Sequence, residues 1–386
     1  MREFRYLKRR MKFRRAAQPR APRIRRLAPA AWLAAPLLAG LLLPLALVPL
    51  RGGHEPAPEA VPQATASPAS PASPAAAAAE APQPEVTVYL SQSGQIETLP
   101  LEDYVSGVLA AEMPADFELE ALKAQAVAAR TFIVRRLLAG DHSGVPVPEA
   151  DVSDTVTHQA YVSQAVLERD WALGGRSTEL AKLRRAVLET RGVIMTYKGQ
   201  PITASFFASS GGYTENSEDY WSVAVPYLRS VASPWELEIT PNLAVTVSFS
   251  IPDLLSRLGL DNTALHASAA LPAASGKATP VSSTSAALPA VVLSLTDGHR
   301  VKEISIGGTV FTGREVREKL GLRSSQFTWK RQGDEVLITT YGNGHGVGMS
   351  QWGANGMAKE GGTATGILKH YYSGVQFTKV STLLKK

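Results

Sequence analysis

An uncharged apolar segment near the start of the chain limits where a folded domain can lie. It runs from Leu27 to Leu50 and follows a strongly basic tail, residues 1–26. About 20 apolar residues cross a bilayer as a helix, and such a helix tolerates some proline. Because clustered Lys and Arg side chains keep their end in the cytoplasm, we predict a single-pass anchor at residues 27–50 that places the C-terminal part outside the cell membrane.

A cleaved signal peptide is the alternative interpretation of this segment. The segment is long for a signal peptide, and no convincing small-residue cleavage site follows it, which favours an uncleaved anchor. The basic tail is also a possible nucleic-acid arm. However, twelve of the 40 Lys and Arg residues but only one of the 34 acids lie in residues 1–26, so the rest is net acidic. We therefore expect no nucleic-acid partner.

The composition after the apolar segment predicts an α+β fold preceded by the transmembrane helix and a disordered linker. Proline and alanine dominate residues 51–84, which suits an extended spacer. Residues 85–243 are predicted to form a lobe of helices and strands that holds the candidate catalytic residues. Residues 244–335 form a smaller, strand-rich second lobe with a low-complexity, disordered insertion at 262–289. The glycine-rich residues 336–386 return to the first lobe.

Hydrophobic periodicity and turn residues predict the main elements of both lobes. VTVYL and IETLP form a strand pair, and two further strands flank the turn at Lys198 and Gly199. Helix starts are expected at Ser250–Asp253 and at Gly313–Glu315. The helices of the first lobe are predicted at Leu101–Met113, Glu118–Ala139 and Glu179–Thr190.

Glu112 lies at the end of an apolar stripe. It follows Val108 by four residues and Leu109 by three, and Pro114 ends the helix just beyond it. Burial and the negative end of the helix dipole both raise the pKa of a carboxyl group, so Glu112 can keep its proton as a general acid. A structural carboxylate tied to a backbone amide or a basic partner fits the periodicity equally well.

Two cations follow on the next predicted helix. Lys123 and Arg130 are seven residues apart and share a helix face with Val127 and Val134. One interpretation is that they face the same cleft as Glu112. The other is that both side chains only extend along the surface of the helix with their charged ends in water.

Two segments rich in glycine and serine are candidates for lining a groove. GNGHGVGMSQWGANG contains His345, Ser350 and Gln351, and it is not a phosphate-binding loop because no Gly-Lys-Ser/Thr follows. ASSGGYTENSEDYW contains the candidates Ser209, Ser210, Gly211 and Tyr213. A serine nucleophile, Ser209 or Ser210 activated by His345, stays open, although the Gly-x-Ser-x-Gly elbow is missing.

The residue types give no reason to predict a metal or a cofactor. The chain has no cysteine and no His-Glu-x-x-His motif, and its histidines are far apart in sequence. An exported domain without disulfides must depend on its hydrophobic core for stability.

The ordered set of motifs resembles the stage II sporulation protein D family of spore-forming bacteria. The resemblance covers most of residues 86–380 and is specific as a combination. Its carriers are LPLEDYVSGVLAAEMPADFELEALKAQAVAARTF, DTVTHQAYV, SFFASSGGYTENSEDYW, GREVREKLGLRSSQF and NGHGVGMSQWGANGMA.

The resemblance implies a peptidoglycan lytic transglycosylase that cleaves glycan strands without stem peptides at the sporulation septum during engulfment. It implies that Glu112 is the catalytic acid and that Lys123 and Arg130 matter for activity. Gln159 and Tyr161, in the second motif, join the expected substrate-binding residues. Members that bind zinc use cysteines, so no metal is expected here.

The resemblance also implies partners. These are peptidoglycan glycan strands, the membrane through residues 27–50, a sporulation amidase and a third engulfment membrane protein. Relatives called amidase enhancers suggest an alternative, a glycan-binding module without catalysis. A serine hydrolase is the third possibility.

Overall fold

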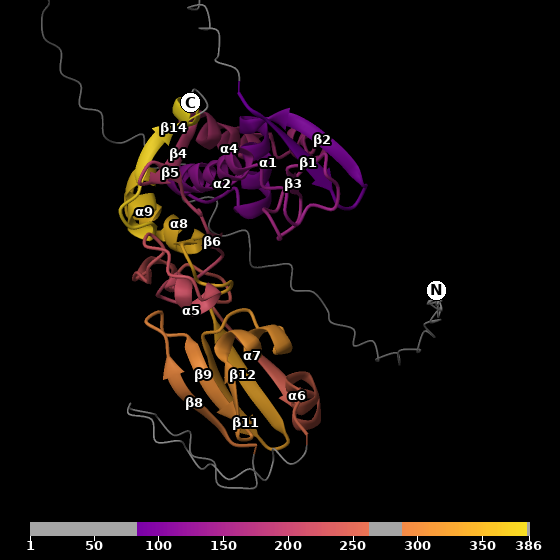
Figure 1. Ribbon diagram of the computed structural model, residues 1–386, viewed down its shortest axis with the longest axis vertical. Helices are drawn as coiled ribbons and strands as arrows, with labels where there is room; N and C mark the ends of the chain where they lie inside the picture. The colour runs from indigo at the N-terminus through magenta and orange to yellow at the C-terminus, as the bar shows by residue number, and fades with distance from the viewer. Residues whose placement is uncertain (1–82, 262–287, 384–386) are drawn as a thin grey trace, which may run out of the picture. The chain divides into compact units, whose positions relative to one another are not determined.

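The computed structural model describes residues 83–261 and 288–383 and has a mixed α+β fold with several small sheets (Figure 1). Buried apolar side chains form two hydrophobic cores. One contains residues between 86 and 228 and between 347 and 380, and the elements around it are named the helical lobe. The other contains residues between 251 and 338, and its elements are named the sheet lobe.

The helical lobe contains most of the helices. Its elements are β1 (Glu85–Leu90), β2 (Gln95–Pro100), α1 (Leu101–Glu112), α2 (Leu119–Ala139), β3 (Val152–Ser153), α3 (Gln164–Val166), the π-helical turn η1 (Leu167–Ala172), α4 (Ser177–Glu189), β4 (Val193–Tyr197), β5 (Gln200–Pro201), β6 (Phe206–Phe207), α5 (Ser217–Trp221), the 3-10 turn η2 (Pro234–Glu236), β13 (Met349–Ser350), α8 (Gln351–Lys359), α9 (Ala364–Tyr371), β14 (Gln376–Lys379) and α10 (Val380–Leu383).

The three predicted helices of this lobe are confirmed as α1, α2 and α4, with small differences at their ends. α1 ends because Met113, which precedes Pro114, is extended with φ −121° and ψ 134°. α2 ends at Gly140, whose left-handed φ of 58° is easily adopted by glycine.

Three small sheets complete the helical lobe. The predicted strand pair is confirmed as antiparallel β1 and β2, and β3 runs parallel to β1. β4 lies between β5 and β14, and β6 pairs with β13. The strand after the Lys198–Gly199 turn, β5, is short and covers only Gln200–Pro201.

The sheet lobe has two three-stranded sheets, β11-β12-β7 and β10-β9-β8. Its elements are β7 (Ala244–Ser250), α6 (Ile251–Leu258), β8 (Ala290–Leu295), β9 (Val301–Ile306), β10 (Thr309–Thr312), α7 (Gly313–Leu320), β11 (Phe327–Gln332) and β12 (Glu335–Tyr341). β12 corrects the return predicted at residue 336. Its alternating burial at Val336, Ile338 and Thr340 fits a strand between β7 and β11, so the chain stays in the sheet lobe through Tyr341.

Both predicted helix starts in this lobe are confirmed. Ser250 accepts a hydrogen bond from the backbone N–H of Asp253 at the start of α6. Thr312 and Glu315 form a capping box at the start of α7.

The predicted anchor, the linker up to residue 82 and residues 262–287 of the insertion lie outside the described residues. Within residues 83–261 and 288–383, no helix has the length and apolar character needed to cross a bilayer.

Candidate active site

Glu112, the last residue of α1, faces a cavity of about 760 Å³, named here the Glu112 cavity. Its Oε1 atom accepts a hydrogen bond of 3.0 Å from the backbone N–H of Ala160. Its Oε2 atom accepts one of 3.3 Å from Nε2 of Gln351, the first residue of α8. The carboxyl group is therefore held by two donors from distant parts of the chain at the wall of a cavity.

Burial raises the pKa of Glu112 above its ordinary value, and the hydrogen bonds from Ala160 and Gln351 offset part of the rise. A raised pKa keeps a larger fraction of the carboxyl group protonated near neutral pH. Geometry and protonation state thus both suit a general acid.

This balance predicts a pH shift for Gln351→Met. The substitution removes a donor that favours the carboxylate, so the pKa of Glu112 rises further. A general acid works only when protonated, so catalysis declines as pH rises through that pKa. We expect the high-pH limb of the kcat/KM profile to move to higher pH. Gln376, which is exposed on β14, provides the control Gln376→Met. If the high-pH limb of Gln351→Met does not move, the assignment of Glu112 as the general acid is contradicted.

The Glu112 cavity combines both lobes. The helical lobe supplies most of its lining, and α7 of the sheet lobe supplies two arginines. The lining residues are Glu112, Phe132, Val156, Thr157, His158, Gln159, Thr203, Ala204, Ser205, Phe206, Phe207, Ala208, Tyr220, Trp221, Arg314, Arg317, Asn343, Gly344, His345 and Gln351.

Four rings form an aromatic wall in this cavity. The ring of His345 lies 5.5 Å from Phe207, 5.7 Å from Tyr220 and 5.5 Å from Trp221, between ring centroids. Tyr220 and Trp221 end the short helix α5. Such rings present flat apolar faces together with polar edges.

His345 is kept neutral. Burial and the nearby charges of Arg300 and Arg317 lower its pKa to about 3. Its Nδ1 atom accepts a hydrogen bond from the backbone N–H of Val347, so Nε2 carries the proton and faces Ser205 Oγ at 3.4 Å. In this tautomer Nε2 of the ring cannot take a proton from Ser205.

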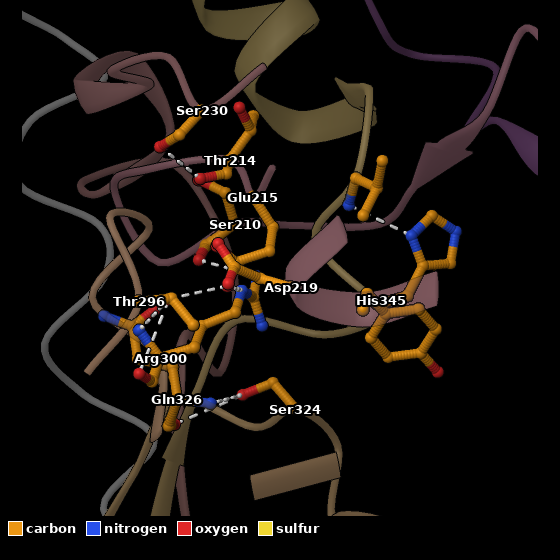
Figure 2. A network of polar contacts seen from close by, with 12 residues as sticks. Ser210, Thr214, Glu215, Asp219, Ser230, Thr296, Arg300, Ser324, Gln326 and His345 are labelled. Carbon is orange, nitrogen blue, oxygen red and sulfur yellow. Dashed lines mark hydrogen bonds and ion pairs between the residues drawn. The ribbon is translucent and has the colours of Figure 1, made fainter. Parts of the chain in front are cut away.

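The low pKa of His345 is partly due to a buried polar network next to it (Figure 2). Arg300 and Glu215 are almost fully buried, and Arg300 Nε lies 3.5 Å from Glu215 Oε2. Arg300 also donates to the backbone carbonyl of Ser210. Gly346, with φ 91°, lies so close that an added Cβ would be 2.5 Å from Arg300 Nε.

Ser210 and Ser350 were expected in the groove, and the structure places them elsewhere. Both are fully buried and both donate to the buried carboxyl group of Glu236, Ser350 over 2.7 Å. Burial raises the pKa of Glu236, and the serine hydrogen bonds offset part of that rise. Because their hydroxyls are used in this way, these serines hold the structure together.

Three other candidates also lie away from the cavity lining. Ser209 is buried and pairs with Asn343 through backbone hydrogen bonds. Gly211 packs against the Gln326 side chain. Tyr213 is 40% exposed, and its ring centroid is 4.3 Å from that of His299.

Gln159 and Tyr161 differ in their positions relative to the cavity, since only Gln159 lines it. The Oε1 atom of Gln159 accepts from Tyr104 Oη at 3.1 Å. Its buried Nε2 has no hydrogen-bond partner among the described residues. Tyr161 instead donates to Glu97 over 2.7 Å and stacks on Tyr104.

The cleft role predicted for Lys123 and Arg130 is not supported by their positions, since neither lines the Glu112 cavity. Lys123 pairs with Glu120 at 2.7 Å and with Glu189. Arg130 is fully buried and pairs with Glu102 at 2.5 Å. Packing directs Lys123 toward Glu189 of α4 and Arg130 toward Glu102 of α1, so the charged end of Arg130 is not in water either.

Sequence reasoning overlooked Arg314, Arg317 and Glu236 and did not single out Tyr220 and Trp221. The signal for the arginines was their i, i+3 spacing in GREVREKLGL. Their position in the same cavity as Glu112 depends on the fold of the sheet lobe, which local spacing does not predict.

The donor set does not fit a metal site. No group of three or more His, Cys, Asp or Glu side chains within residues 83–261 and 288–383 is placed to hold a metal ion. Both ring nitrogens of His158, the histidine of the DTVTHQAYV motif, are used by hydrogen bonds to Ser153 and to the carbonyl of Ser143.

Together these features define an α+β protein whose candidate active site is one carboxyl group in an aromatic-lined cavity. Residues 89–197 match the family described as Stage II sporulation protein, SpoIID. The chain is 43% identical to stage II sporulation protein D of Bacillus subtilis (strain 168) over 348 residues, 90% of this chain and 94% of the relative. The chain therefore belongs to the stage II sporulation protein D family.

Two further relatives show how widely the similarity extends. Stage II sporulation protein D of Bacillus amyloliquefaciens is 44% identical over 301 residues, which is 78% of this chain and 80% of the relative. The amidase enhancer of Bacillus subtilis (strain 168) is 32% identical over 315 residues, 71% of this chain and 40% of the relative.

Proposed function

We propose that this protein is a membrane-anchored peptidoglycan lytic transglycosylase. It cleaves the bond between MurNAc and GlcNAc in glycan strands that have lost their stem peptides. The observation that carries the proposal is Glu112, a carboxyl group with raised pKa at the wall of an open cavity. The cavity volume, about 760 Å³, is within the range of small-ligand sites.

The reaction requires one acid that later acts as a base. Glu112 gives its proton to the glycosidic oxygen as the bond from that oxygen to C1 of MurNAc breaks. The carboxylate then accepts the proton of the C6 hydroxyl of MurNAc, whose oxygen bonds to C1. A 1,6-anhydro end forms, no water is consumed, and Glu112 is again protonated.

The lining of the cavity supports a mechanism with one carboxyl group. Hydrolytic glycosidases usually position two acids around the bond that breaks. Within the described part of the chain, Glu112 is the only acid that lines the cavity. An internal hydroxyl nucleophile removes the need for a second one.

Substrate sugars are proposed to stack on the aromatic wall of Phe207, Tyr220, Trp221 and His345. Gln159 also lines the cavity that holds these rings and Glu112.

The test is a product analysis with purified full-length protein and peptide-free glycan strands. We expect mass spectrometry to find new 1,6-anhydro ends, because an internal hydroxyl closes onto C1. Reducing ends alone would show hydrolysis and contradict the mechanism. Intact strands that bind the protein would favour the alternative, a non-catalytic glycan-binding module.

The alternative has one observation in its favour, the similarity to an amidase enhancer. A binding module needs the aromatic wall but has no need of a protonated acid, so the raised pKa of Glu112 favours an enzyme.

The proposed location follows from the predicted anchor at residues 27–50. The protein acts outside the membrane at the sporulation septum during engulfment, with a sporulation amidase and a third engulfment membrane protein as proposed partners. An amidase that removes stem peptides produces the substrate proposed here.

A further inference from the structure

Helix α7 of the sheet lobe is held in one position next to the Glu112 cavity. Thr312 and Glu315 cap its start reciprocally. Gly313 packs so tightly on β9 that an added Cβ would lie 1.9 Å from the carbonyl oxygen of Val301. The first turn of α7 therefore has little freedom, and the side chains that leave it have a defined origin.

Arg314, in the first turn of α7, and Arg317, in the turn that follows, reach to α5. Arg314 donates from Nη1 to the carbonyl of Tyr220 at 2.8 Å, and its guanidinium carbon lies 4.7 Å from the centre of the Tyr220 ring. Arg317 donates from Nη1 to the Tyr220 hydroxyl at 3.0 Å. Both arginines thus contact the aromatic wall and line the cavity that contains Glu112.

Each guanidinium keeps donors for another partner. The Nε group of Arg314 donates to Glu318 at 2.8 Å, and that of Arg317 donates to the carbonyl of Leu322 at 3.3 Å. Within the described residues, neither Nη2 group makes a hydrogen bond to the protein. A charged Nη2 group without a protein partner can donate a hydrogen bond to a carboxylate.

The charges of the cavity differ between its two contributing lobes. The helical lobe supplies the carboxyl group of Glu112, whose raised pKa reduces its negative charge. The sheet lobe supplies two permanent cations, and Glu318, exposed on the outer side of α7, offsets part of the charge of Arg314. The charge of Arg317 also lowers the pKa of His345, so its field extends along the aromatic wall.

We infer that Arg314 and Arg317 bind a carboxylate of the sugar in the Glu112 cavity and so select acidic glycan. The inference rests on the proposed function. The lactyl group of MurNAc carries a free carboxylate when no stem peptide is attached. When a stem peptide is attached, the same carbonyl group forms an amide, which is neutral. Carboxylate binding by this pair explains a preference for peptide-free strands through charge.

A purely structural role is the competing explanation. In that case the two arginines only hold α5 and the ring of Tyr220, and their loss weakens binding of every glycan equally. The two explanations predict different binding of a strand whose lactyl carboxylates have been converted to methylamides. Such a strand can still stack on the aromatic wall, but it has no charge for the arginines to bind.

The experiment measures binding in a Glu112→Gln background, so that no strand is cut and the result does not depend on catalysis. The ligands are peptide-free strands and the same strands after methylamide conversion. We expect about tenfold tighter binding of the charged strands, as for one charge-assisted contact. Equal binding of the two strands by protein with both arginines overturns the inference even if cleavage occurs.

The variant arm adds Arg314→Gln and Arg317→Gln, singly and together, with Lys319→Gln as the control. Lys319 is an exposed cation on α7 that does not line the cavity. The double variant should bind both strands equally, near the affinity of the parent for methylamide strands, while Lys319→Gln keeps the preference. Equal losses for both strands in the arginine variants show the structural role and overturn the inference. If the double variant unfolds, the single variants and the comparison of strands by the parent still decide.

Discussion

The Glu112→Gln variant is expected to release 1,6-anhydro ends about a thousandfold more slowly than the wild-type protein, the usual size of a general acid–base effect. Glutamine has nearly the same shape and still accepts the hydrogen bond that Ala160 donates. It has no proton to give to the glycosidic oxygen and cannot take one from the C6 hydroxyl. Mass spectrometry of the ends at fixed times measures the effect.

Folding of this variant should be preserved. Because burial raises the pKa of Glu112, its contribution to stability is present below the ordinary glutamate pKa and is lost as pH rises through the raised value. A neutral glutamine avoids that loss. The control is Asp103→Asn, an exposed acid on the same helix, which should cleave normally. Normal end release by Glu112→Gln would refute the mechanism, whereas slow release together with unfolding would not support it.

The Arg130→Met variant is expected to lose about 3–5 kcal/mol of unfolding free energy, because it breaks a buried ion pair. Arg130 contacts both carboxylate oxygens of Glu102 and donates to the Val193 carbonyl at 3.2 Å. Glu102 also accepts from the backbone N–H of Gly192. One guanidinium thus connects α1 and α2 with β4. Urea unfolding of the full-length protein measures the loss.

Exposed Arg135 on α2 provides the matched control, and Arg135→Met should change the unfolding free energy very little. Glycan affinity distinguishes the two roles of Arg130. We expect the folded fraction of Arg130→Met to bind peptide-free strands as the wild type does. A stable variant with weakened glycan binding would restore Arg130 to the substrate site and contradict its position in the structure.

Tertiary contacts explain which of the predicted groove residues line the cavity and which are buried elsewhere. Glu112 and Gln351 meet because α1 ends and α8 begins beside the cavity. His345 and Gln159 line the same cavity from loops. Ser210 and Ser350 had the composition of groove residues, but Glu236, from a distant segment, takes their hydroxyls. A buried carboxyl group needs hydrogen-bond donors, and the local sequence does not predict which residues supply them.

The sequence by itself determined the local features of this protein. Apolar periodicity set α1 and α2, Pro114 ended α1 directly after Glu112, and turn and capping residues set the strand pair and the start of α7, because these depend on neighbours within a few residues. The tertiary structure alone decided which polar side chains share a cavity. It buried Arg130 against Glu102 and brought Arg317, about 200 residues from Glu112 in the chain, to the same cavity. Long-range burial and charge pairing make that choice, and they depend on the packing of the whole chain.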